Sequence, residues 1–547
     1  MAPSLLCAPF ADCGDDRTEK TVPNSEKMKL TVLFRAFLLL AALAALLPVQ
    51  AKDRRLLYLP LDERFTTRDL FLAYARITPY RVVTPDRSML PRQKIPPDMG
   101  AMLAWTERWA KEADAAIISA DMLLYGGLIA SRTSTETIER IRPRLQLLAR
   151  LKQLNPRLIV YVSTTVMRMP SYSSSEEEPD YYALYGRQIF LFSQHLHRYE
   201  LLGDPRDREL AEKYRKQIPD EVLADYLQRR QRNLSFNREL IALVERGAID
   251  RLSITLDDNA EFGLFKKEAT ELARLAHPLG SRVLIYPGAD EAQLALLAKL
   301  IARDQSARIR VVYRFPQASK LIPAFEGQPL DESVRQQVAA SGGTIVEGEA
   351  DAILFINNFP DRQTFAGAQP QVSTASVKPL EAWLASRNAM PSSRAILILA
   401  DNKYYNGADV ELVTALLQSR FPSERIAYAG WNTSGNTLGS AIALGILRLH
   451  MPPTRLPEYK RILWARLMED WVYMVEGREQ IKRDMERRGL RSFAGTPLER
   501  EYEQRMEQLF NQHAPIINRY LETDFFVTRV FFPWHRPFEI GFEIGAR

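Results

Sequence analysis

RLSITLDDNAEFG, residues 251–263, passes directly from an apolar run into a cluster of carboxylates. Residues 252–256 form a short run that is typical of a buried parallel strand. Asp257 and Asp258 follow at once, and Asn259 comes next. Because neighbouring like charges repel, two carboxylates at the end of a buried strand need compensation from the rest of the fold. We therefore expect further polar groups near this strand end.

Similar apolar runs recur along the chain and alternate with longer helical stretches. Runs typical of covered parallel strands occupy residues 56–61, 81–84, 115–120, 158–163, 252–256, 283–286, 309–314, 352–356, 395–400 and 426–430. Helical periodicity covers 136–153, 291–302 and 408–419, among others. This alternation predicts an α/β fold, and we expect a (β/α)8-barrel-like parallel sheet followed by a C-terminal helical segment.

The first 51 residues carry the features of export. Met28 is a second plausible start, Lys29 and Arg35 form a basic region, and residues 36–47 are apolar. Residues 49–51, Val-Gln-Ala, fit a signal-peptidase site. The apolar run is shorter than the roughly 20 residues of a comfortable membrane span. We interpret 1–51 as an upstream extension plus signal peptide, with an uncleaved anchor as the alternative, and expect a periplasmic or secreted protein without a stable membrane span after cleavage.

The exported chain divides into two predicted regions. Residues 52–451 form an α/β catalytic domain, and ten strand candidates leave room for an N-terminal α/β subdomain. Residues 452–547 form a helical segment that ends in an aromatic tail. Both cysteines, Cys7 and Cys13, lie upstream, so the exported chain has no disulfide and no cysteine nucleophile.

Composition narrows the chemistry further. The net charge is +6 with 26% charged residues, and the charges are interspersed, so we expect no nucleic-acid partner. None of the six histidines follows a predicted strand, which argues against zinc. No phosphate-binding loop, dinucleotide fingerprint or serine-hydrolase elbow is present. We expect no cofactor, although a carboxylate site for Mg²⁺ or Ca²⁺ stays open as an alternative.

Polar and aromatic residues follow most of the predicted strands, where sites are built in parallel α/β folds. The candidates for substrate binding are Asp62, Glu63, Arg64, Asp121, Tyr125, Arg168, Asn259, Asp290, Glu291, Asp401, Asn402, Tyr405, Asp409, Trp431, Asn432 and Asn436. Each alone could be a turn or a helix cap. Asp290 and Glu291 begin a predicted helix and could serve merely as its cap. Ser434 and Asn436 could likewise cap a helix over 437–444. Their recurrence predicts a real site at this edge.

Carboxylates accompanied by amides and aromatic rings suit a sugar. Rings pack on the apolar faces of sugars and amides bond hydroxyl groups. Glycoside hydrolysis needs two carboxyl groups, or one acid and a substrate group that replaces the second.

Most of the exported chain resembles an uncharacterised bacterial family with a domain of unknown function, DUF4127. The motifs that carry the resemblance are YLPLDER, SADMLLYGGLIASR, PSYSSSEEEPDYY, LIYPGADE, ADNKYYNGAD and AGWNTSGNTLGSAIA. This resemblance supplies a family but no activity.

The later motifs are also similar in order to O-GlcNAcase-type β-N-acetylglucosaminidases, which are (β/α)8 barrels. The shared features are the Asp–Asp pair, the turn in YPGADE, Asp401-Asn402 with YYNGAD, and the asparagine loop of GWNTSGNTLGSAIA. The resemblance implies that Asp257 orients a 2-acetamido group and that Asp258 is the general acid, with the acetamide oxygen as nucleophile. It further implies that Asp401, Asn402 and Asn432 bind the sugar.

These observations favour an exported glycosidase that acts on an N-acetylated amino sugar, with Asp257 and Asp258 as catalytic residues. The alternatives are a metal-dependent hydrolase with Asp62, Asp121 and Asp257 as ligands, and a non-catalytic glycan- or solute-binding protein. The number of carboxylates favours an enzyme. The acidic loop SSSEEEPDYY is typically solvent-exposed, but it follows strand 158–163 and could wall the site through Glu176, Glu177 and Glu178.

Overall fold

A computed structural model describes residues 54–386, 388–389, 392 and 394–546. The expected signal peptide and upstream extension lie outside the described residues. Within the described part of the chain, no helix is both long and apolar enough to cross a membrane.

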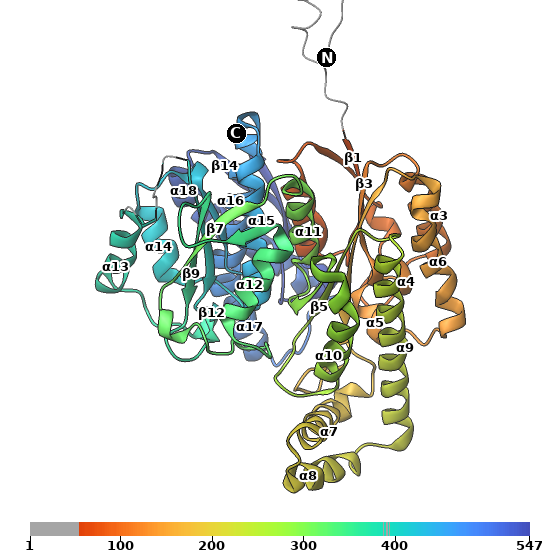
Figure 1. The fold of residues 1–547 in the computed structure, drawn as a ribbon. Helices are drawn as coiled ribbons and strands as arrows, with labels where there is room; N and C mark the ends of the chain where they lie inside the picture. The colour runs from red at the N-terminus through yellow and green to blue at the C-terminus, as the bar shows by residue number, and fades with distance from the viewer. Residues whose placement is uncertain (1–53, 387, 390–391, 393, 547) are drawn as a thin grey trace, which may run out of the picture. The chain divides into compact units, whose positions relative to one another are not determined.

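The first half of the chain forms a six-stranded parallel sheet, called the first sheet below (Figure 1). Its strands are β1 (Arg54–Leu59), β2 (Tyr80–Val83), β3 (Ala115–Ser119), β4 (Ile159–Val166), β5 (Arg251–Leu256) and β6 (Val283–Pro287). They are arranged in the order β2-β1-β3-β4-β5-β6. The strand β5 lies between β4 and β6, and all its residues except Arg251 are buried, which explains its continuous apolar pattern.

The second half forms a five-stranded parallel sheet, called the second sheet below. Its strands are β7 (Ala307–Tyr313), β8 (Gly343–Ile345), β9 (Ala352–Asn358), β11 (Ile396–Asn402) and β13 (Ile426–Ala429), in the order β13-β11-β9-β7-β8. Numbered from its own first strand, each sheet reads 2-1-3-4-5, with a sixth strand added to the first. This is a doubly wound order, in which ligands bind where the order reverses.

All ten predicted strands are present within a few residues of their expected bounds. The α/β class and the parallel sheets are therefore confirmed, as are the helices expected over 136–153, 291–302 and 408–419. The strand pairings describe two sheets, and a barrel-like arrangement stays a prediction.

Helices cover both sheets. Those of the first half are η1 (Phe65–Asp69), α2 (Leu70–Ala75), α3 (Met99–Ala110), α4 (Ala120–Tyr125), α5 (Leu128–Thr133), α6 (Ile138–Leu154), α7 (Tyr182–Leu202), α8 (Pro205–Arg215), α9 (Asp220–Glu245) and α10 (Leu264–Ala276). Those around the second sheet are α11 (Ala292–Ile301), α12 (Leu330–Ser341), α13 (Thr374–Leu384), α14 (Val410–Gln418) and α15 (Ser434–His450).

One apolar core joins the two sheets. It contains Leu56 and Ile117 from the first sheet, Leu297 from α11, and Leu354 from the second sheet, all fully buried. The helix α11 packs on α15, on α12 and on strands of the first sheet, and it lies between the sheets in Figure 1. A separate core covers the other face of the first sheet under α3, α6 and α9. The two sheets therefore share one buried layer.

The C-terminal region is helical up to residue 521, with α16 (Leu456–Leu467), η8 (Met468–Gly477), α17 (Arg478–Arg487) and α18 (Pro497–Leu521). The aromatic tail then forms an antiparallel hairpin of β14 (Phe525–Phe531) and β15 (Gly541–Ala546), which the sequence reading did not separate from the helical segment. The predicted domain boundaries stay a prediction.

Candidate functional site

The carboxyl ends of the two sheets meet. The backbone N–H of Asn259, after β5, donates to the carbonyl of Phe325, after β7, at 3.0 Å. The N–H of Asp290, after β6, donates to Oδ1 of Asn436, at 3.1 Å. Polar residues from both halves therefore gather around one region, as the strand-end pattern predicts.

Asp257 and Asp258 each pair with a different arginine. Arg132 Nη2 lies 2.5 Å from Asp257 Oδ2, and Arg168 Nη1 lies 2.6 Å from Asp258 Oδ2. Their side chains are 16% and 21% exposed, whereas both arginines are buried. Asp258 also has a positive φ of 35°, which costs free energy for a non-glycine residue. The arginines provide the compensation that the paired charges require and leave both carboxylates within reach of a ligand.

The surroundings of Asp258 raise its proton affinity. Burial and the neighbouring charge of Asp257 raise the pKa of Asp258 to about 6, against the opposing effect of Arg168. Asp258 can therefore hold a proton up to about pH 6, beside a carboxylate that is paired with Arg132.

The acidic loop before α7 joins these arginines. Glu177 Oε2 lies 3.0 Å from Arg132 Nη1 and 2.9 Å from Arg168 Nη2, and Glu178 accepts from Arg168 Nε at 2.8 Å. Although burial opposes it, these arginines and Arg536 hold the pKa of Glu177 well below its usual range. The expectation of a solvent-exposed loop is wrong for Glu178, which is buried, and Glu177 lies against the site. Arg132, Arg168, Glu177, Asp257 and Asp258 are called the arginine–carboxylate cluster below.

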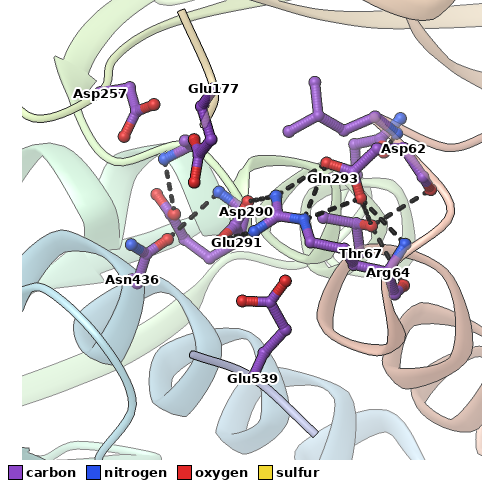
Figure 2. A network of polar contacts seen from close by, with 12 residues as sticks. Asp62, Arg64, Thr67, Glu177, Asp257, Asp290, Glu291, Gln293, Asn436 and Glu539 are labelled. Carbon is purple, nitrogen blue, oxygen red and sulfur yellow. Dashed lines mark hydrogen bonds and ion pairs between the residues drawn. The ribbon is translucent and has the colours of Figure 1, made fainter. Parts of the chain in front are cut away.

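A second group of charges surrounds Arg64, after β1 (Figure 2). Its Nη2 lies 2.7 Å from Asp62 Oδ2 and 2.5 Å from Asp290 Oδ1. Asp62 also accepts from Thr67 Oγ1 at 2.6 Å. Burial raises the pKa of Asp290 to about 7, although Arg64 opposes this. Asp290 is an ion-pair partner of Arg64, and among the described residues no side-chain hydrogen bond caps the start of α11.

The C-terminal tail reaches both groups. The guanidinium groups of Arg64 and Arg536 pack over the ring of Trp534 at 4.5 and 4.6 Å, and the Trp534 indole N–H donates to Glu63. Arg536 pairs with Glu177 and, at 3.1 Å, with buried Glu539. The sequence reading missed Trp534, Arg536 and Glu539, because nothing local marks a contact with residues more than 350 positions away.

The carboxylates after β11 are held differently. Asp401 accepts from Asn357 Nδ2 at 2.8 Å and from the Asp409 N–H at 2.7 Å. Asp409 pairs with Arg314 and Lys403 and caps α14. Both carboxylates are fully buried. Burial and Asp409 raise the pKa of Asp401 to about 7. Asp401 and Asp409 therefore support the loops at the carboxyl end of the second sheet.

Four further candidates lie at the second sheet. Asn402 Oδ1 and Trp431 Nε1 are buried and have no hydrogen-bond partner among the residues that the structure describes. Asn432 has a positive φ of 62°, and its carbonyl accepts from the Asn406 N–H at 2.8 Å. Tyr405 is half-buried, and its ring packs edge-on against Phe325.

Two candidates, Asp121 and Tyr125, contact neighbouring elements of the first half. Asp121 accepts from the N–H and the hydroxyl of Thr165, both at 3.0 Å. Tyr125 is buried against Phe236.

Three more lie where the halves meet. Asn259 Nδ2 donates to the Leu256 carbonyl at 3.0 Å, and Glu291 accepts from Gln337 Nε2 at 2.8 Å. The helix α15 begins at Ser434 after Thr433, so the expected helix start at 437 is wrong, and Asn436 instead bonds Thr433 and Asp290.

The carboxylates that would form the alternative metal site are already engaged elsewhere. Asp62 is bound by Arg64, Asp121 by Thr165 and Asp257 by Arg132. Within the residues that the structure describes, no three or more His, Cys, Asp or Glu residues are grouped in a way that could hold a metal ion. The donor set observed here therefore does not fit the metal-hydrolase alternative.

A family model described as "Protein of unknown function (DUF4127)" matches residues 56–543. The chain therefore belongs to this family. Searches of curated proteins and of solved structures found no match.

Proposed function

We propose that this DUF4127 protein is an exported glycoside hydrolase that cleaves an N-acetylated amino-sugar glycan by a substrate-assisted, retaining mechanism. Asp257 orients the 2-acetamido group, Asp258 donates a proton to the leaving oxygen, and the acetamide oxygen attacks the anomeric carbon. Water then opens the resulting oxazoline, with Asp258 as the base. A barrel-like arrangement of the parallel strands belongs to the same proposal.

The single observation that supports this proposal most is the asymmetry of the Asp257–Asp258 pair. Both side chains reach the surface at the carboxyl end of β5, and the pKa of Asp258 is raised to about 6. A general acid is most effective when its pKa lies near the working pH. A carboxyl group with a raised pKa beside an ion-paired carboxylate is an arrangement that suits a general acid and its partner.

On the side of the second sheet, the partly exposed residues are the better candidates to contact sugar. Asn432 and Tyr405 are half-buried, whereas Asp401 and Asn402 have no exposed surface. We therefore assign direct binding to Asn432 and Tyr405, and a supporting role to Asp401 and Asn402.

A panel of aryl glycosides tests the activity. The purified chain is assayed with matched substrates that carry either a 2-acetamido or a 2-hydroxyl group. We expect turnover only with the 2-acetamido series. Equal rates in both series would contradict the substrate-assisted mechanism. Absence of turnover with every glycoside would contradict the proposal that the protein is a hydrolase.

The Arg168 ion pair favours a second candidate, a non-catalytic glycan-binding protein of the envelope. The contact of 2.6 Å between Arg168 and Asp258 stabilises the charged carboxylate, which cannot donate a proton. Calorimetry with a sugar that binds and is recovered chemically unchanged would support this reading over the first.

A further inference from the structure

A cavity of about 680 Å³ lies outside the arginine–carboxylate cluster, where α2, α16 and the β14–β15 hairpin meet. Much of its lining is apolar and comes from Leu72, Ala73, Ala465, Phe531, Phe542 and Ile544. Its volume lies in the range of about 300–1,000 Å³ that is usual for small-molecule sites. None of the residues proposed for the glycosidase lines it.

Most charged side chains of this cavity are already paired. The pairs are Arg87 with Asp69, Arg529 with Glu543, and His535 with Glu499. Glu503 has no ion pair within the described residues, and burial and Glu499 raise its pKa, against the opposing charge of Arg529.

Two arginines of the lining have no carboxylate partner in the described part of the chain. Arg76, just after α2, is exposed and makes no ion pair or side-chain hydrogen bond there. Arg461, on α16, donates to the Ile544 carbonyl at 2.7 Å and packs over Phe525 at 4.7 Å. Burial and the charge of Arg76 lower the pKa of Arg461, against the smaller opposing charge of Glu458, so the two cations destabilise each other. A bound anion would relieve this repulsion.

We propose that this cavity binds an amphiphile with an anionic head group, a carboxylate or a phosphate, and an apolar chain. Arg76 and Arg461 hold the head group by charge-assisted hydrogen bonds, for which guanidinium groups are well suited. The apolar chain lies along Leu72, Ala465 and Phe542. This site is independent of the proposed glycosidase.

Calorimetric titration of the purified chain tests the proposal with four probes below their micelle concentrations: decanoate, decyl phosphate, neutral decyl maltoside and cationic decyltrimethylammonium. We expect saturable binding of the two anions and binding at least tenfold weaker for the other two. Arg76→Gln should weaken anion binding about tenfold, and Arg76→Glu should weaken it more. Arg76 makes no side-chain contact that the fold needs, so these variants should fold normally.

Arg150→Gln is the matched control, because Arg150 is exposed on α6 and does not line the cavity. Equal binding of all four probes, no saturable binding, or an Arg76→Glu variant with unchanged affinity would overturn the proposal. Flotation with phosphatidylglycerol vesicles, against phosphatidylcholine vesicles, separates a membrane head group from a free amphiphile. Binding to the vesicles that Arg76→Glu abolishes would identify the membrane as the source.

Discussion

The carboxylates at and after the carboxyl ends of β5 and β11, one strand from each sheet, have opposite surroundings. Asp257 and Asp258 pair with arginines and stay 16% and 21% exposed. Asp401 and Asp409 are fully buried, and Asp401 is held by an amide, a backbone N–H and the hydroxyl of Tyr428. Both sites have aspartates at or after the carboxyl end of a parallel strand. The exposed fraction of the side chains distinguishes the candidate catalytic pair from the pair that supports the fold.

Asp258→Asn should give the largest effect and would sharpen this contrast most. An amide cannot donate the proton, so we expect kcat/KM to fall about 10²- to 10⁴-fold for substrates with poor leaving groups. Activated aryl glycosides, which need less protonation, should lose far less. Steady-state kinetics on both substrate types measure this.

The control for that experiment is Asp304→Asn, which changes an aspartate that is 85% exposed. Its rates should match those of the wild type. The fold of the Asp258→Asn protein is protected because Arg168 keeps Glu177 and Glu178 as partners. Equal losses on both substrate types would contradict the acid assignment.

Asp401→Asn tests the other side of the comparison. The carboxylate accepts through both oxygens, from Asn357 and from the Asp409 N–H, whereas an amide has only one acceptor oxygen. We therefore expect the free energy of unfolding to fall by about 1–3 kcal/mol. Asp257→Asn should cost less, because Arg132 keeps Glu177 and Glu178. Urea titrations of the two variants measure the difference. A larger loss of unfolding free energy for Asp257→Asn than for Asp401→Asn would contradict the assignment of Asp401 as the supporting residue.

The pH dependence of activity should follow Asp258. The protonated carboxyl is the active form, so kcat/KM should fall as the pH rises through about 6, by about tenfold per unit above it. A pH–rate profile from pH 5 to 8 measures this. A flat profile between pH 6 and 8 would show that Asp258 is not the acid.

Trp534→Phe should give the smallest effect. Phenylalanine keeps a smaller ring beside Arg64 and Arg536 and loses the hydrogen bond to Glu63, which still accepts from the Gln93 N–H at 2.8 Å. We expect a loss of about 0.5–1.5 kcal/mol in unfolding free energy. Trp109→Phe is the control, since the indole N–H of Trp109 makes no hydrogen bond to the described residues. Equal losses would mean that the Glu63 contact contributes nothing.

Ten strands of the two parallel sheets could be predicted because they are short apolar runs, as in residues 352–358, which are buried throughout. The partners of the predicted aspartates could be predicted only in part: Arg64 and Arg168 follow strands and were candidates themselves, whereas Arg132 was not. Arg132 is 125 positions from Asp257, and nothing in its own helix marks it as a partner. Arg536 lies in a tail whose hairpin was not expected, and only the folded chain brings it to Glu177. The residues at strand ends could be predicted, whereas the arginines that distant segments contribute to the site could not.

The apolar layer that α11 shares between the sheets has a consequence for cooperativity. Doubly wound sheets often form separate domains, yet here Leu56, Leu297 and Leu354 belong to one buried layer. We expect the two halves to lose their hydrogen-exchange protection together. A substitution that creates a cavity against β9 should therefore also lower the protection of β5. The stability of the arginine–carboxylate cluster is therefore a property of the whole layer, including residues far from any ligand.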